Sequence, residues 1–180
     1  MVVGAVEALQ ATVLMFYGVN FFVLGMVLLG YGELKDAGPI FLAAGGINGL
    51  IALSVFNANL TAAVGDFVIV AFLLLVFAVT WLAAGLVAIM GAGVKPIGSL
   101  GLFFGLAMIP FAAFLVQADL PSRIWLTVSV VSWIWVFFTL PLAFVFEKIS
   151  AKTAGWSFII QAFYTLWIPA ALLTAGVVIP

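Results

Sequence analysis

Residues 67–94 read FVIVAFLLLVFAVTWLAAGLVAIMGAGV, a run of 28 residues between Asp66 and Lys95 that contains no charged side chain. A bilayer core about 30 Å thick is crossed by about 20 apolar residues in a helix. The run is therefore long enough to cross a membrane once and too short to cross it twice. It lacks the alternating apolar and polar pattern of a barrel strand, so it predicts a transmembrane helix.

Charged residues separate five further stretches of similar length, and turn-forming residues such as Asn57-Ala58-Asn59 and Leu120-Pro121-Ser122 lie between them. Each stretch is again long enough for one crossing. The connections are short, so helices that follow one another in the chain are expected to be antiparallel neighbours. The sequence therefore predicts a single transmembrane domain over residues 1–180, with helices at 9–30, 39–57, 66–90, 97–117, 122–146 and 155–178.

The composition excludes most other classes of protein. Hydrophobic residues make up 68% of the chain and charged residues 6%, whereas a soluble domain has about 25% charged residues. This excludes a soluble enzyme and a disordered chain, and five Lys and Arg residues are too few for a nucleic-acid partner. The chain has no His and no Cys, so we expect no catalytic residues of those types, no metal site and no cofactor.

The basic residues predict the orientation in the membrane. Lys35, Lys95, Lys148 and Lys152 lie in the connections after the first, third and fifth predicted helices, whereas the opposite side carries Arg123. Connections rich in Lys and Arg face the cytoplasm. Both termini are therefore expected outside, and no removable signal peptide is expected at the N-terminus.

A tetrapeptide of the form Lys-x-x-Gly occurs three times, at residues 35–38, 95–98 and 152–155. Each copy opens an even-numbered predicted helix, and a small residue follows ten positions after each Lys, at Gly45, Gly105 and Ala162. Small residues let helices approach closely in lipid. The pattern favours an all-α membrane protein built of three helix hairpins around a central pore. The alternative is coincidence, because Gly is abundant here and Lys marks cytoplasmic loops generally.

None of the predicted helices has an Asp, Glu, Lys, Arg or His near its middle. Ion and proton coupling usually require such a residue, so the chain is expected to conduct a neutral solute downhill. One alternative is a secondary transporter of a small neutral solute coupled to sodium, with the ion bound by carbonyl and hydroxyl oxygens. Another is an accessory membrane subunit without a lumen. The hydroxyls available for sodium are Thr80, Ser129, Ser132, Thr139 and Thr165.

Aromatic side chains lie deep in two predicted helices. Phe77 and Trp81 are four residues apart and share one helix face, as do Trp133 and Phe137, whereas Trp135 points away from Trp133. Rings on facing helices would form a flat-walled slot for a small planar amide, and an ion would lose its hydration there without compensation. The alternative is that these rings face lipid or fill space between helices.

Polar groups in the predicted helices allow two interpretations. The amides of Asn20, Asn48 and Gln161 need partners in hydrocarbon, either on another helix or on a passing solute. Three prolines are each expected to free a backbone carbonyl and to kink a helix: Pro110, Pro141 and Pro169.

The chain resembles the AmiS/UreI family of bacterial urea and short-chain amide channels over nearly its whole length. The segment from Trp156 to Ala170, which contains Thr165-Leu166-Trp167-Ile168-Pro169-Ala170, is the most similar to the family pattern. The order and gapless spacing of several short matches carry the resemblance. The other matches are Gly18, Gly25, Gly45-Gly46, Thr80-Trp81-Leu82, Pro96 and Ile109-Pro110.

The resemblance implies a passive channel in the bacterial cytoplasmic (inner) membrane, with lipids around it and a homo-hexamer with one pore per protomer. It implies urea or a short-chain amide as permeant and a functional link to a cytoplasmic urease or amidase. Urea and acetamide are both planar, neutral and similar in width, so the sequence favours neither. The residues that the resemblance places at the pore are Leu14, Tyr17, Phe21, Phe77, Trp81, Trp133, Val136, Phe137 and Gln161.

The chain departs from acid-gated members of the family in two respects. Those members carry a His-rich outer loop, whereas the corresponding segment here, residues 57–65, is short and has no His. They also have a Glu where this chain has Gln161. Because His is the side chain whose usual pKa lies near 6.5, we predict a pore that acid does not gate.

Overall fold

The computed structural model describes residues 5–62, 65–117 and 123–177, and every regular element in these ranges is helical. Six spans in this part of the chain are long and apolar enough to cross a membrane, which confirms the predicted class of an all-helical membrane protein. The elements are α1 (Ala5–Leu29), α2 (Leu34–Ala62), α3 (Gly65–Ile89), α4 (Lys95–Leu115), α5 (Arg123–Phe144), α6 (Ala151–Gln161), the π-helix η1 (Ala162–Trp167) and α7 (Ile168–Thr174).

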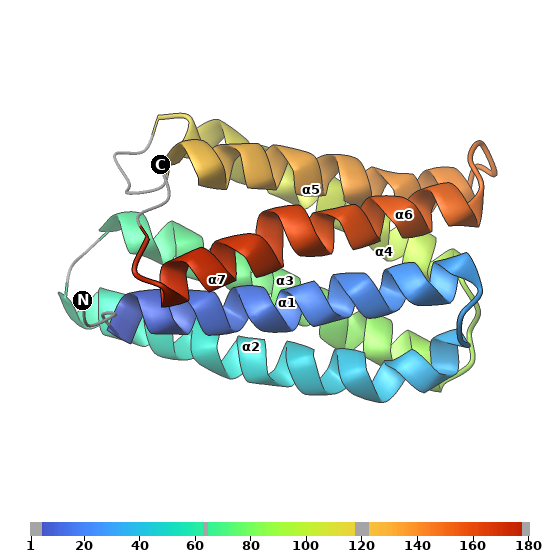
Figure 1. The fold of residues 1–180 in the computed structure, drawn as a ribbon, viewed down its shortest axis with the longest axis horizontal. Helices are drawn as coiled ribbons and strands as arrows, with labels where there is room; N and C mark the ends of the chain where they lie inside the picture. Colours follow the sequence, from blue (N-terminus) through green and yellow to red (C-terminus); the bar gives the residue numbers. More distant parts are fainter. Residues whose placement is uncertain (1–4, 63–64, 118–122, 178–180) are drawn as a thin grey trace.

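The six spans form a ring in chain order. Each span packs on the one before and the one after it, and α6, η1 and α7 together form the sixth span, which packs on α1 and closes the ring. Figure 1 shows the spans side by side, with α1 between α2 and α7. The start of α1 and the end of α7 lie at one end of the bundle, which we call the terminal end.

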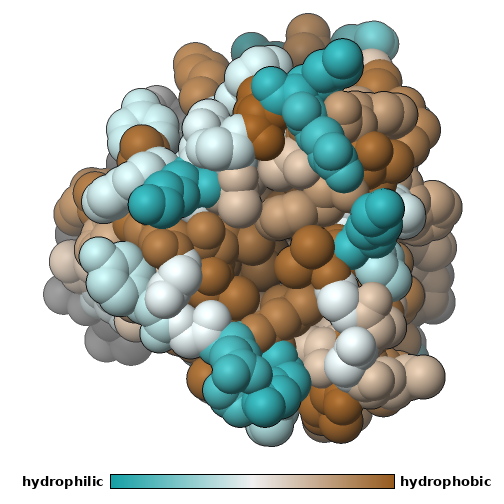
Figure 2. All heavy atoms as spheres, turned by 90° about the vertical axis from the view of Figure 1, so that its right-hand side faces the viewer, coloured by the Kyte–Doolittle hydropathy of each residue, from teal (hydrophilic) through white to brown (hydrophobic). Residues whose placement is uncertain are grey.

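The opposite end, which we call the lysine end, carries the connections after α1, α3 and α5. Lys35 lies there at the start of α2 and forms an exposed ion pair with Glu33, with 2.9 Å between Nζ and Oε2. Figure 2 looks onto this end: hydrophilic side chains lie around its rim, and hydrophobic side chains fill a hollowed centre. The helix polarity thus brings the lysine-bearing connections to one face of the bundle, as the sequence predicts.

Several predicted helix boundaries are wrong, and the first two helices begin at Ala5 and Leu34 rather than at residues 9 and 39. The expected break at Asn57-Ala58-Asn59 does not occur, because α2 continues through it to Ala62. Asparagine costs a helix less than about 1 kcal/mol per residue, so two of them do not end it. The sixth span begins at Ala151 rather than at residue 155, since the Oγ of Ser150 caps it by accepting a hydrogen bond from the backbone N–H of Thr153 at 3.1 Å. The expected break at residues 120–122 lies outside the described residues.

The sixth span is interrupted by η1, and Pro169 provides the reason. Proline has no backbone N–H, and its ring clashes with the carbonyl four residues earlier in an α-helix, here that of Thr165. The π-helix η1, at residues 162–167, widens the span just before this proline. Pro110 and Pro141 by contrast lie inside continuous α-helices.

The glycines of the three tetrapeptides lie at close helix contacts, but not within the hairpins that the repeat suggests. A Cβ atom at Gly38 would lie 2.6 Å from a side-chain atom of α3, and one at Gly155 would lie 2.9 Å from a backbone oxygen of α1. The corresponding contact of Gly98, at 3.0 Å, is with the residue that follows α5. Each even-numbered span therefore packs most closely on its other neighbour in the ring. These close pairs are α2 with α3, α4 with α5, and α6 with α1.

Candidate functional site

The three odd-numbered helices each direct a pair of aromatic rings into the centre of the bundle. Because the two rings of a pair are four residues apart, they lie on the same helix face, about 6 Å apart along the axis. All six side chains are less than 5% exposed. The pairs are Tyr17 and Phe21 on α1, Phe77 and Trp81 on α3, and Trp133 and Phe137 on α5.

The first member of each pair lies nearer the terminal end, and together these rings form what we call the first tier. The ring centroids of Tyr17 and Phe77 are 4.9 Å apart, and those of Phe77 and Trp133 are 5.0 Å apart. These spacings are those of rings in direct contact. Three helices thus contribute one ring each to a single layer.

The second tier consists of Phe21, Trp81 and Phe137, one helical turn closer to the lysine end. The Phe21 centroid lies 5.7 Å from those of both Trp81 and Phe137. The even-numbered helices add rings that the sequence analysis missed: Phe41 lies 5.2 Å from Trp81, and Phe158 lies 5.0 Å from Phe21. The repeat carries a signal for both, since each occurs six residues after a tetrapeptide lysine.

The remaining residues expected at the pore fall into two groups. Leu14 and Val136 are buried, 7% and 1% exposed, and belong to the same apolar core as the tiers. Gln161 is only half-buried at the end of α6, although its Oε1 atom is buried without a protein hydrogen-bond partner in the described part of the chain. Eight of the nine predicted residues are thus brought together, and their role in a pore stays a prediction.

The polar atoms of the aromatic side chains differ in whether they have partners. The Tyr17 hydroxyl donates to the carbonyl of Leu74 at 2.5 Å, and Trp133 Nε1 donates to Thr165 Oγ1 at 2.7 Å. Trp81 Nε1 is buried and has no acceptor among the described residues.

Thr165 connects the first tier to the π-helix. Its hydroxyl accepts from Trp133 and donates to the backbone oxygen of Gln161 at 2.9 Å. We expect Thr165→Val to lower stability by about 1–3 kcal/mol, because it leaves a buried indole N–H unpaired. Thr165→Ser keeps the acceptor and should cost less. Thermal unfolding of the purified protein measures both, and equal losses would show that the hydrogen bond contributes little.

The buried amides lack the helix–helix hydrogen bonds that one interpretation expects. Asn20 and Asn48 are both 0% exposed, and neither has a partner for its nitrogen or oxygen among the described residues. The Ser129 Oγ and Trp125 Nε1 atoms are likewise buried without a hydrogen-bond partner in this part of the chain.

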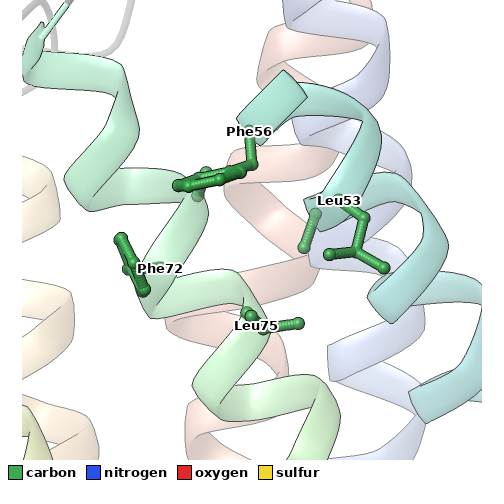
Figure 3. Close-up of a pocket in the computed structure, with 6 residues that line it drawn as sticks. Leu53, Phe56, Phe72 and Leu75 are labelled. Carbon is green, nitrogen blue, oxygen red and sulfur yellow. The ribbon is translucent and has the colours of Figure 1, made fainter. Parts of the chain in front are cut away.

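An apolar cavity of about 240 Å³ lies away from the tiers, between α2 and α3. Figure 3 shows Leu53 and Phe56 from α2 opposite Phe72 and Leu75 from α3. Leu53 is 52% exposed and Phe72 46% exposed, so the cavity opens to the outside of the bundle. Its lining offers no side-chain hydrogen-bond partner, which makes it a poor site for a polar solute.

These features define a multi-pass membrane protein with six spans in a closed ring and aromatic rings stacked on its axis. A sequence model described as the AmiS/UreI family transporter matches residues 9–177, and the chain belongs to this family. The family resemblance seen in the sequence is thereby confirmed. No curated protein sequence matches the chain.

Two solved structures have a similar fold. The crystal structure of the urea channel from the human gastric pathogen Helicobacter pylori matches with a TM-score of 0.80 and 20% identity, over 93% of this chain and 98% of that one. A cryo-electron microscopy structure of the Helicobacter pylori urea channel in a closed state matches with a TM-score of 0.78 and 21% identity, over 92% of this chain and 97% of that one.

Proposed function

We propose that this protein is a passive channel for urea and short-chain aliphatic amides in the bacterial cytoplasmic membrane. The observation that carries the proposal is the pair of aromatic tiers, to which α1, α3 and α5 each contribute one ring per tier. Membership of the AmiS/UreI family and the fold shared with a urea channel support it. We propose further that the lysine end faces the cytoplasm, that the channel is a homo-hexamer, and that it supplies a cytoplasmic urease or amidase.

The tiers suggest how the channel selects its solute. Rings in contact form flat apolar walls, and a planar molecule passes between them when a ring turns aside. An ion would have to leave its hydration shell with no charged side chain to replace it, which makes its passage unfavourable. Within the second tier, Trp81 Nε1 can donate a hydrogen bond to the carbonyl oxygen of urea or an amide.

Purified protein in liposomes tests the function directly. We expect vesicles that contain the protein to take up urea and acetamide much faster than empty vesicles, until the concentrations on both sides are equal. Uptake should be independent of a sodium gradient. Accumulation above equilibrium that depends on sodium would instead support a secondary transporter, and no uptake would support an accessory subunit.

Urea flux is also expected to be independent of acid. The chain has no His, so no side chain with a usual pKa near 6.5 is present to change its charge in this range. Flux into proteoliposomes should therefore differ by less than about twofold between about pH 5 and pH 7.5. A steep rise towards acid pH would contradict the proposal of an ungated pore.

A further inference from the structure

Two amides in the spans are buried without protein partners in the described part of the chain, whereas several hydroxyls in the spans are paired. The hydroxyls of Thr80 and Ser132 donate to backbone oxygens four residues earlier, both at 2.7 Å. The nitrogen and oxygen of Asn20 and of Asn48 have no partner among the described residues, although both side chains are 0% exposed. Burial of an unpaired amide is unfavourable, so these positions need an explanation other than packing.

The periodicity of the α-helix places Asn48 beside the aromatic tiers. Phe41 on α2 contacts Trp81 of the second tier, with 5.2 Å between the ring centroids. Asn48 follows Phe41 by seven residues, which is almost two full turns. It therefore lies on the same face of α2 as Phe41, about 10 Å closer to the terminal end, near the level of the first tier.

Asn20 lies on the side of α1 that is turned towards α2. A Cβ atom at Gly18 would come within 2.2 Å of Trp167 Nε1, so this face of α1 packs on η1. Asn20 is two residues further and is rotated by about 200° from Gly18. It therefore points to the opposite side, where α2 packs along α1, as the order of the helices in Figure 1 also shows. The two amides thus share the α1–α2 side of the bundle axis.

We infer that Asn20 and Asn48 form a recognition site for the amide group of the permeant, and this rests on the proposed channel function. A carboxamide carries a donor and an acceptor side by side. This pair is complementary to the carbonyl oxygen and the adjacent N–H of urea or a primary amide, so one asparagine makes two hydrogen bonds. The aromatic walls exclude large or charged solutes, whereas the asparagines compensate the permeant for the water that it loses.

Replacement of either asparagine by leucine tests this site. Asn48→Leu and Asn20→Leu should each lower urea and acetamide permeability of proteoliposomes by at least about fivefold, because each removes two hydrogen bonds and about fivefold is the effect of losing one. Osmotic water permeability of the same vesicles serves as the reference and should stay unchanged. The thermal unfolding midpoint should stay equal or rise, because leucine has the same branching of side-chain heavy atoms and removes an unpaired polar group. Asn57→Leu, at an exposed position of α2, is the matched control and should retain wild-type permeability.

The possible outcomes separate this inference from the proposed function. If the wild-type protein conducts no urea, both the proposed channel function and the recognition site are wrong. If it conducts urea and the leucine variants do so equally well, the recognition site alone is wrong. A lower unfolding midpoint with unchanged permeability would show that the amides hold the helices together. If Asn48→Leu does not assemble, Asn48→Ala removes the amide without the added bulk, and the same permeability loss is expected.

Discussion

Alanine in place of Gly101 is expected to lower the stability of the protein by about 2 kcal/mol, because the added Cβ atom overpacks the contact between α4 and α5. That atom would lie 2.7 Å from the backbone oxygen of Phe137 and 2.7 Å from Cβ of Leu140. Neither atom is the end of a flexible side chain, so the helices themselves must move apart. For a chain of this length the loss corresponds to a drop of about 4–8 °C in the thermal unfolding midpoint.

Gly46→Ala is the matched control for this prediction. Nothing lies within 4 Å of a Cβ atom at Gly46, which is also inside a helix. Alanine is favoured over glycine in a helix by about 1 kcal/mol, so the unfolding midpoint should stay equal or rise slightly. Equal losses at both positions would show that the α4–α5 contact does not determine the response. Because Phe137 belongs to the second tier, Gly101→Ala should also disturb permeability, whereas Gly46→Ala should not.

The sequence predicts the spans well because the determining signal is local. A charge inside a span is costly, so the spacing of charged residues alone places the six helices. Two of the ends that were missed depend on features at single positions: Ser150 caps α6, and Asn57 and Asn59 do not end α2. Ser150 is itself a readable signal, since serine is preferred at a helix N-cap. Pro169 likewise predicts a disturbed helix, but its form as a π-turn follows only from the structure.

The candidate site is predictable only in part. Helical spacing brings Phe77 and Trp81 onto one face of α3 and Trp133 and Phe137 onto one face of α5, and the resemblance adds the matching rings on α1. The repeat does not reveal which neighbour Gly38 or Gly155 contacts, because both neighbours of an even-numbered helix are equally apolar. Hydrogen-bond partners are not readable either: Trp133 and Trp81 are alike in the sequence, yet one indole N–H is paired with Thr165 and the other is unpaired.

Removal of a ring from the second tier is expected to change which solutes pass. Trp81→Ala and Phe137→Ala each delete one wall of the tier, so the permeability of a branched amide such as isobutyramide relative to urea should rise roughly tenfold, equivalent to about 1.4 kcal/mol in barrier height. Trp81→Phe separates the two roles of this residue. It keeps an aromatic wall but removes the buried indole N–H, so urea permeability should fall about fivefold with little change in size selectivity.

Trp135→Ala is the control, because it removes the same kind of ring from the same helix but outside the tiers. Its side chain is 64% exposed, whereas Trp133, two residues earlier, is 4% exposed. Permeabilities should be measured with each variant reconstituted at equal protein content, together with its unfolding midpoint. Loss of a buried Trp or Phe costs a packed core about 3–5 kcal/mol, so a lower midpoint is expected whether or not the ring lines a pore. Selectivity is therefore the decisive measurement. If Trp81→Ala and Phe137→Ala show the same solute selectivity as the wild-type protein and the Trp135→Ala control, the rings of the tiers only pack the core. The permeation path would then lie elsewhere.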